Sequence, residues 1–246
     1  MDRVIYTAMN GARQIMLKQA TNSNNLANIN TTGFRADLDA FQSLPMFGPG
    51  HPTRVYPEDN RVGVDFSQGT MISTGRDLDV AISGDGFISV QDVDGGESLT
   101  RRGDLRISPE GLLTNGAGRP VLGNGGPIAI PPAQKVTIGS DGTISIIPQG
   151  GDAMSMAVID RIKLVNPPLD GLRKTETGLF RPADGEPVPA DASVTLSPGS
   201  LEGSNVNATE ALVNMIELAR QYEMQVKVLK DAEEAERNAS SIARVT

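Results

Sequence analysis

The chain has few side chains whose types and spacing could form a catalytic centre. His51 is its only histidine and stands between Gly50 and Pro52. A serine triad or a zinc site would need further partners, and no G-x-S-x-G motif is present. Asp77 and Asp79 could act as a glycosidase pair, but with 30 acidic residues in the chain a chance pairing explains them better. We therefore interpret His51 as a solvated loop residue and predict no catalytic site.

Candidate metal and phosphate sites are also weak. Asp92 and Asp94 before Gly95 are arranged like the start of a calcium loop, but the third ligand and the distal glutamate are missing. We interpret them as turn residues. The glycines of 84–86 and 123–126 lie among strand signals without the following helix that would receive a phosphate. The absence of cysteine excludes disulfides and thiolate metal sites, and we predict no cofactor.

Charge and hydropathy exclude other classes of function. The formal net charge is −8, and no segment forms the basic stripe that nucleic acid requires. No stretch approaches the ~18 apolar residues of a membrane span. The first residues lack the basic region and continuous apolar core of a cleavable signal peptide. We predict a protein that neither binds nucleic acid nor inserts into a membrane.

The elements that would hold any site are helical at both ends and β-rich between them. Apolar residues from 2 to about 29 recur at helical spacing, although Asn10-Gly11 weakens this helix. Residues 42–64 carry four prolines and suggest an irregular connector. Short alternating runs, with Asp-Gly and Asn-Gly turns between them, predict antiparallel strands from about 62 to 197. The predicted fold is α+β: a discontinuous helical, coiled-coil domain from both termini (1–41 and 201–246), the connector 42–64, and an inserted antiparallel all-β domain (65–200).

The C-terminal helix has more apolar surface than one partner can cover. Asn207 is placed to cap it. A 4-3 seam then runs through Ala208, Leu212, Met215, Ala219, Tyr222, Val226 and Leu229. Ala211, Ile216 and Leu218 widen the seam, while Val213, Met224 and Val228 lie off it. Partner helices are therefore expected from other subunits.

Three groups of residues, in order, resemble the signatures of the bacterial flagellar rod and hook proteins. The first is Asn24-Asn25-Leu26-Ala27-Asn28 with Thr32-Gly33-Phe34; the second comprises 78–82, 84–87 and Thr100-Arg101; the third is 201–207 with Tyr222-Glu223-Met224. The start of the chain and its length resemble the proximal-rod members, with distal-rod members as the alternative. The resemblance implies a structural subunit that transmits motor torque for motility.

The resemblance also implies the surroundings of the protein. It would assemble helically with copies of itself and with other proximal and distal rod proteins. It would leave the cell through the flagellar type III export apparatus without a cleaved signal peptide, and reside in the basal-body rod within the periplasm. A rival interpretation is a secreted β-domain enzyme or glycan-binding protein that acts on peptidoglycan.

The predicted assembly interface combines the apolar helix faces with the polar asparagines, whose amides could fix register between subunits. Its residues are Ile5, Met9, Ala12, Met16, Asn24, Asn25, Leu26, Asn28, Phe34, Asn205, Asn207, Leu212, Met215, Ile216, Ala219, Tyr222, Met224, Val226 and Leu229.

Overall fold

The computed structural model describes residues 2–45, 55–150, 156–175 and 177–243, so His51 lies outside the described residues. The chain divides into two compact units. The helical unit comprises residues 1–29, 36–65 and 206–246, and the β unit comprises residues 30–35 and 66–205. No helix within the described ranges is long and apolar enough to cross a membrane.

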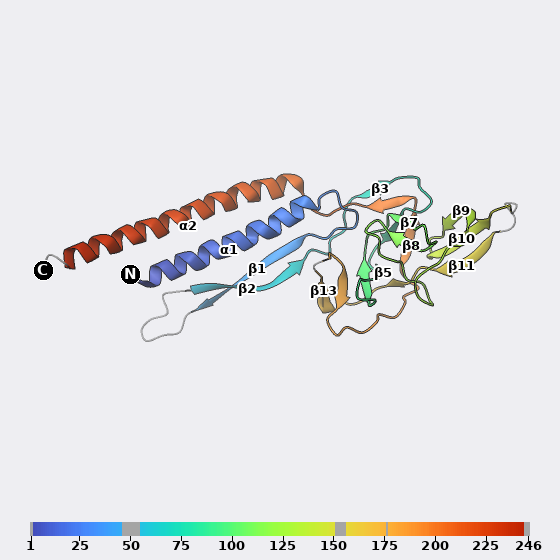
Figure 1. The fold of residues 1–246 in the computed structure, drawn as a ribbon, viewed down its shortest axis with the longest axis horizontal. Helices are drawn as coiled ribbons and strands as arrows, with labels where there is room; N and C mark the ends of the chain where they lie inside the picture. The colour runs from blue at the N-terminus through green and yellow to red at the C-terminus, as the bar shows by residue number, and fades with distance from the viewer. Residues whose placement is uncertain (1, 46–54, 151–155, 176, 244–246) are drawn as a thin grey trace. The chain divides into compact units, whose positions relative to one another are not determined.

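The helical unit is built on two antiparallel helices, α1 (Asp2–Ala27) and α2 (Ala208–Ala243), that run side by side (Figure 1). The Asn22 side chain donates a 2.7 Å hydrogen bond to the carbonyl of Ala211 near the start of α2. Further along, Gln225 lies next to Gly11, where an added Cβ would be 3.4 Å from its side chain. Asn207 caps α2 as predicted, because its side-chain oxygen accepts from the backbone N–H groups of Thr209 and Glu210.

Two paired strands complete the helical unit, so the prediction of an irregular connector over 42–64 was wrong for 42–45 and 55–64, while 46–54 lie outside the described residues. Strands β1 (Asp37–Pro45) and β2 (Val55–Val64) pair antiparallel, with a register shift between Asp39 and Phe41. Prolines are compatible with this structure because a two-stranded sheet consists of edge strands, where one side of each backbone needs no partner. Both strands pack on α1, which therefore has neighbours on two sides (Figure 1).

The β unit contains short strands, and every pairing recorded between them is antiparallel. One sheet has the order β12-β5-β6-β14-β13 and another β11-β10-β9; β3 pairs with β16, β4 with β15 and β7 with β8. The strands are β3 Met71–Ser73, β4 Val80–Ser83, β5 Phe87–Gln91, β6 Glu97–Thr100, β7 Leu105–Ile107, β8 Leu113–Asn115, β9 Ala133–Ile138, β10 Thr143–Pro148, β11 Ala157–Arg161, β12 Leu164–Val165, β13 Leu172–Lys174, β14 Phe180–Pro182, β15 Thr195–Pro198 and β16 Ser200–Glu202, with a 3-10 turn at Leu169–Gly171.

The predicted runs map onto this unit with two exceptions. The runs 78–82 and 136–138 lie in or at β4 and β9, whereas 128–130 makes only isolated bridges and 161–165 is divided between β11 and β12. The turn prediction holds at Gly95 and Gly142, which have φ of 79° and 85°. At the two Asn-Gly pairs of the β unit, however, the positive φ falls on Gly118 and Gly126, downstream of the expected glycine.

The core of the β unit is aliphatic with an aromatic cluster at one side. Ile88, Leu105, Leu113, Val121 and Ile144 have no exposed surface, and they belong to one continuous cluster. The rings of Phe66, Phe87 and Phe180 pack with centroids 5.5–6.3 Å apart. Burial of each such side chain stabilises the fold by about 1.5–3 kcal/mol. This unit therefore has a continuous apolar core of its own.

Candidate assembly surfaces and the Glu202 cluster

Helix α1 exposes a stripe of large apolar side chains. Tyr6, Met9, Met16 and Leu17 are exposed, and at 100° per residue they span about 100° of the helix surface. Ala8 is buried, and the predicted interface residues Ile5, Ala12 and Leu26 are half-buried, so their side chains are partly covered within the chain. We call the four exposed residues the α1 stripe.

Helix α2 exposes a wider apolar surface. Leu212, Val213, Ile216, Met224 and Val228 are all exposed, and they span about 160° of the helix at the same rotation per residue. We call these residues the α2 stripes. A single additional helix covers a narrower face than this, so the surface is large enough for more than one neighbour.

The side of α2 that lies along α1 differs from the predicted seam. Ala211 is buried, and the half-buried positions continue through Met215, Leu218, Tyr222, Gln225 and Leu229. Ala208 and Leu212 are exposed, so their assignment to the seam was wrong for packing within the chain. The observed register brings the small residues Ala211 and Gly11 to the helix contact, which a count of large apolar positions does not detect. The interface prediction for Leu212, Ile216 and Met224, and for half-buried Ala219 and Val226, stays a prediction.

The asparagines at the C-terminal end of α1 make contacts inside the subunit. The Asn25 side chain pairs with the backbone of Asp37: its amide donates to the carbonyl at 2.9 Å and its oxygen accepts from the N–H at 2.9 Å. Asn28 donates to the carbonyl of Asn24, one turn earlier, at 3.0 Å. These bonds join the end of α1 to the start of β1 and close the helix end. A contact of Asn24, Asn25 or Asn28 with a neighbouring subunit stays a prediction.

Phe34 and Asn205 are held within the β unit. Phe34 is buried, and the Lys174 ammonium lies 4.0 Å from the centre of its ring. The backbone N–H of Asn205 donates to the carbonyl of Phe34, and its side chain donates to Ser67. Both residues therefore fix the chain where it passes between units, and their predicted role in assembly remains to be tested.

A buried ion cluster lies beside these two residues, and sequence analysis did not identify it. The Glu202 carboxylate accepts from Arg35 Nη2 at 2.6 Å and from Arg101 Nε at 2.8 Å, and all three side chains are at most 4% exposed. Arg101 also donates to the carbonyl of Gly84 at 2.7 Å. Burial lowers the pKa of Arg101, as does the neighbouring Arg35 charge, against the opposing effect of Glu202. We call Arg35, Arg101 and Glu202 the Glu202 cluster.

The cluster gathers the segments at which the chain enters and leaves the β unit. Besides both arginines, Glu202 accepts from the Gly69 N–H at 2.9 Å, and its own carbonyl accepts from the Gly33 N–H at 2.8 Å. Gly33 has φ of 66°, and a Cβ there would lie 2.4 Å from the Arg101 carbonyl carbon, so only glycine fits. The cluster thus joins residues 33–35, 69 and 202, far apart in the sequence.

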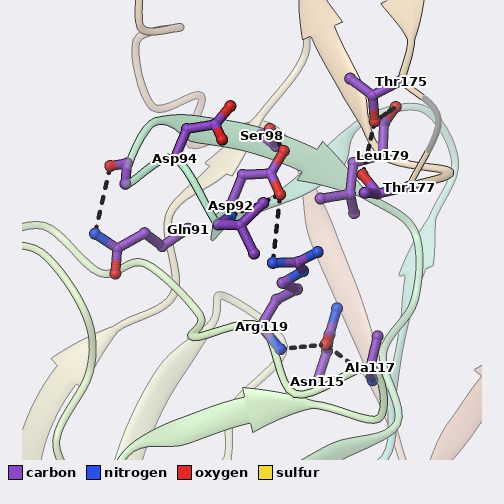
Figure 2. Close-up of polar contacts among 12 residues, drawn as sticks. Gln91, Asp92, Asp94, Ser98, Asn115, Ala117, Arg119, Thr175, Thr177 and Leu179 are labelled. Carbon is purple, nitrogen blue, oxygen red and sulfur yellow. Dashed lines mark hydrogen bonds and ion pairs between the residues drawn. The ribbon is translucent and has the colours of Figure 1, made fainter.

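The two carboxylates considered as calcium ligands, Asp92 and Asp94, form ion pairs with arginine side chains. Asp92 lies 2.6 Å from Arg181 Nη2 and 3.5 Å from Arg119 Nη1, and Figure 2 shows its side chain pointing towards Arg119. Burial would raise the pKa of Asp92, but the Val93 N–H and the two arginines outweigh it and lower that pKa. Asp94 shares Arg181. A turn stabilised by ion pairs accounts for this segment, and no group of three metal-binding side chains occurs among the described residues.

Asp77 and Asp79 do not present two carboxylates to one site. The Asp77 side chain is half exposed and lies 3.9 Å from Lys135, whereas that of Asp79 is buried, 3.7 Å from Arg76. Their separation in burial and in partners removes the basis for a paired acid and base.

Comparisons with known proteins identify the family of the chain. Residues 5–35 match the model described as "Flagella basal body rod protein", residues 81–146 the "Flagellar hook protein FlgE/F/G D1 domain", and residues 197–242 the "Flagellar basal body rod FlgEFG protein C-terminal". The flagellar basal-body rod protein FlgF of Escherichia coli K12 is 41% identical over 240 residues, which cover 95% of both chains. The chain belongs to the flagellar basal-body rod protein family.

Further relatives specify the branch of this family. FlgF of Salmonella typhimurium LT2 is 40% identical over 98% of both chains. The basal-body rod protein FlgG of Bacillus subtilis 168 is 32% identical over 94% of this chain and 96% of its own. The chain is a FlgF-like member of the rod family. The Glu202 cluster draws Arg35 and Glu202 from the first and last matched segments, and Arg101 from the middle one.

Proposed function

We propose that this chain is a structural subunit of the proximal rod of the flagellar basal body, which assembles through its helices and transmits motor torque for motility. The observation that carries the proposal is the match to FlgF relatives over nearly the whole chain. The exposed α1 and α2 stripes support it, because a helix pair that leaves such side chains in water gains stability by burying them against neighbours.

The same proposal includes the partners and the location. Copies of this chain and other rod proteins, proximal and distal, would cover the stripes, so that the helices from both ends form a coiled-coil domain in the rod with the β domain inserted between them. The protein would pass through the type III export apparatus without a cleaved leader and function in the periplasm. Torque transmission requires many distributed contacts and no catalytic group, so we assign no enzymatic activity.

The proposal is tested by placing charge on the α2 stripes of the full-length chain. The double substitution Ile216→Asp and Met224→Asp should abolish swimming and leave basal bodies without a complete rod, because burial of an unpaired carboxylate is unfavourable. The matched control is Asn214→Asp with Gln221→Glu, which adds two negative charges to exposed positions of the same helix and removes no apolar side chain. Normal swimming of the first variant would overturn the proposal.

The relatedness to FlgG makes a distal-rod subunit the second candidate. Expression of the chain in a strain that lacks its FlgF, and separately in one that lacks its FlgG, distinguishes the two. Restored motility in the FlgF-deficient strain alone supports the proximal position, and restoration in the FlgG-deficient strain alone supports the distal one.

A further inference from the structure

Three Asn-Gly pairs occur in the described part of the chain, and their surroundings differ. They are Asn10-Gly11 in α1, Asn115-Gly116 at the end of β8, and Asn124-Gly125 in a bend. An asparagine followed by glycine is chemically able to lose its side-chain amide, because glycine leaves its backbone nitrogen unhindered. The reaction requires that nitrogen to approach the asparagine Cγ, so the local structure decides whether it occurs.

Asn124-Gly125 is open to this reaction. Both residues are exposed, and the turn is closed by a 2.7 Å hydrogen bond from the Gly123 N–H to the Gly126 carbonyl. Within the described residues, neither the Asn124 side chain nor the Gly125 N–H has a hydrogen-bond partner. A Cβ placed on Gly125 would meet nothing within 4 Å. The side chain and the nitrogen are therefore free to meet.

Asn115-Gly116 is closed to it. Asn115 is 2% exposed, and its side-chain oxygen accepts from the backbone N–H groups of Ala117 and Arg119 at 3.1 and 2.9 Å, as Figure 2 shows. These bonds restrain rotation of the Asn115 side chain, on which the approach of Cγ to the Gly116 nitrogen depends. Gly116 is crowded as well, since an added Cβ would lie 1.8 Å from the Asp104 carboxylate.

Asn10-Gly11 is restrained by its helix. Both residues lie inside α1, where each backbone N–H is directed at a carbonyl four residues earlier. Ring closure at this position would need the helix to open first.

We propose that Asn124 is a site of spontaneous deamidation in the folded protein, and that Asn10 and Asn115 are protected. The Gly125 nitrogen attacks Asn124 Cγ and loses its proton, the carboxamide nitrogen leaves as ammonia, and a succinimide forms. Water then opens the ring at either carbonyl, so the net change is gain of water and loss of ammonia, with aspartate or isoaspartate at position 124. No oxidant, enzyme or cofactor is needed.

The product would alter a turn that is hydrogen-bonded to neighbouring strands of the β unit. On one side of the turn, the Leu122 N–H donates to the Ser89 carbonyl and the Leu122 carbonyl accepts from the Lys163 N–H. Gly123 forms an antiparallel bridge with Ile162. A Cβ on Gly123 would lie 2.3 Å from the Asp160 carboxylate, so a new negative charge at position 124 would arise near an existing one. Isoaspartate also adds an atom to the backbone of the turn and would disturb the Gly123–Gly126 pairing.

The experiment is incubation of the purified full-length protein at mildly alkaline pH, followed by peptide mass spectrometry of the three Asn-Gly pairs and detection of isoaspartate with an isoaspartyl methyltransferase. We expect conversion at Asn124 and none at Asn10 or Asn115 over the same period. In denaturant all three should convert at similar rates, since their local sequences are alike. Gly125→Ala, which the open space around Gly125 accommodates, should cause loss of the isoaspartate signal in the folded protein. Conversion at Asn115 as fast as at Asn124, or an unchanged signal in Gly125→Ala, would overturn the proposal.

Discussion

The helical unit and the β unit differ in how far they bury large apolar side chains. Ile144 in the β unit has no exposed surface, whereas Ile216 in α2 is 56% exposed. The β unit encloses one continuous aliphatic cluster, although Ile72, Val93 and Val158 of this unit are exposed, while the helical unit leaves the α1 and α2 stripes uncovered. Because apolar burial drives both folding and association, the β unit has a closed core within one chain, and we expect the helical unit to gain stability by burying its stripes against other chains.

The strongest way to break this comparison is to remove the charge at the centre of the Glu202 cluster. Glu202→Ala leaves Arg35 and Arg101 buried without a counter-charge, which should reduce the free energy of unfolding of the β unit by about 3–5 kcal/mol. Hydrogen exchange of amides in β5 and β10 measures this loss. Tyrosine fluorescence reports the helical unit separately, because Tyr6, Tyr56 and Tyr222 all belong to it.

Two controls sharpen that result. Glu186→Ala removes an exposed glutamate of the same unit and should change stability within about 0.5 kcal/mol. Arg35→Met should cost less than Glu202→Ala, since it leaves the Glu202–Arg101 pair balanced and removes the Arg35 Nε and Nη1 groups, which are buried without a hydrogen-bond partner in the described part of the chain. Equal losses from Arg35→Met and Glu202→Ala would contradict our account of the charges.

A matched pair of isoleucines tests the comparison directly. Ile144→Ala creates a cavity in the closed core and should destabilise the β unit by about 2–5 kcal/mol. Ile216→Ala should change the stability of the purified subunit by no more than about 0.5 kcal/mol, because its side chain is already in water. Chemical denaturation measures the loss of stability in Ile144→Ala. For Ile216→Ala, the assembly of basal bodies shows whether the lost side chain matters for association. A large loss of subunit stability in Ile216→Ala would show that α2 is covered within the chain.

The start of α2 offers a smaller test confined to the helical unit. Asn207→Ala removes the acceptor for two backbone N–H groups, so the first turn of α2 should lose about 1 kcal/mol of local stability. Hydrogen exchange of residues 208–211 should become faster, while exchange in the β unit stays unchanged. Asn214→Ala, at an exposed position inside the same helix, serves as the control, and comparable loss of protection there would argue against a capping role.

Low pH should reduce the free energy of unfolding of the β unit, and each carboxyl group should contribute less than the substitutions above. Asp92 and Asp104 both have a lowered pKa: burial opposes the shift, and it is outweighed by the Val93 N–H and two arginines at Asp92 and by Arg102 and Thr32 at Asp104. A carboxyl whose folded pKa is depressed contributes stability above its unfolded pKa of about 3.9, and that contribution is lost as the pH falls through the folded value. The free energy of unfolding should therefore decline below about pH 4. Asp92→Asn should flatten this decline, and an unchanged pH profile would refute the assignment.

Much of the fold was accessible from local pattern. The 3.6-residue period of 2–29, the cap at Asn207 and the alternating runs near 80 and 136 each depend on neighbours in sequence, and the structure confirms them. The strand pairing at 42–45 and 55–64 was missed because prolines such as Pro45 and Pro57 indicate irregular chain, whereas an edge strand accepts them without loss of a needed hydrogen bond. The predicted seam of α2 was wrong at its start, where Ala211 is buried and Ala208 and Leu212 are exposed.

The candidate site was also predictable from the sequence only in part. Amphipathic excess on the C-terminal helix was evident from the sequence, and the structure locates the exposed side chains. The Glu202 cluster has no local signature in the sequence, since Arg35 and Glu202 are 167 positions apart. The sequence around a charged residue also does not tell whether its side chain will be buried or exposed to solvent.

By itself, the sequence determined the class of elements, the rod family and an excess of apolar helix surface, because period and ordered motifs are properties of neighbouring residues. Only the tertiary structure decided which isoleucines are enclosed, which of three Asn-Gly pairs is open, and which charges are buried together. Burial and hydrogen bonding depend on segments that folding brings together from distant parts of the chain, so identical residues and dipeptides acquire different chemistry there.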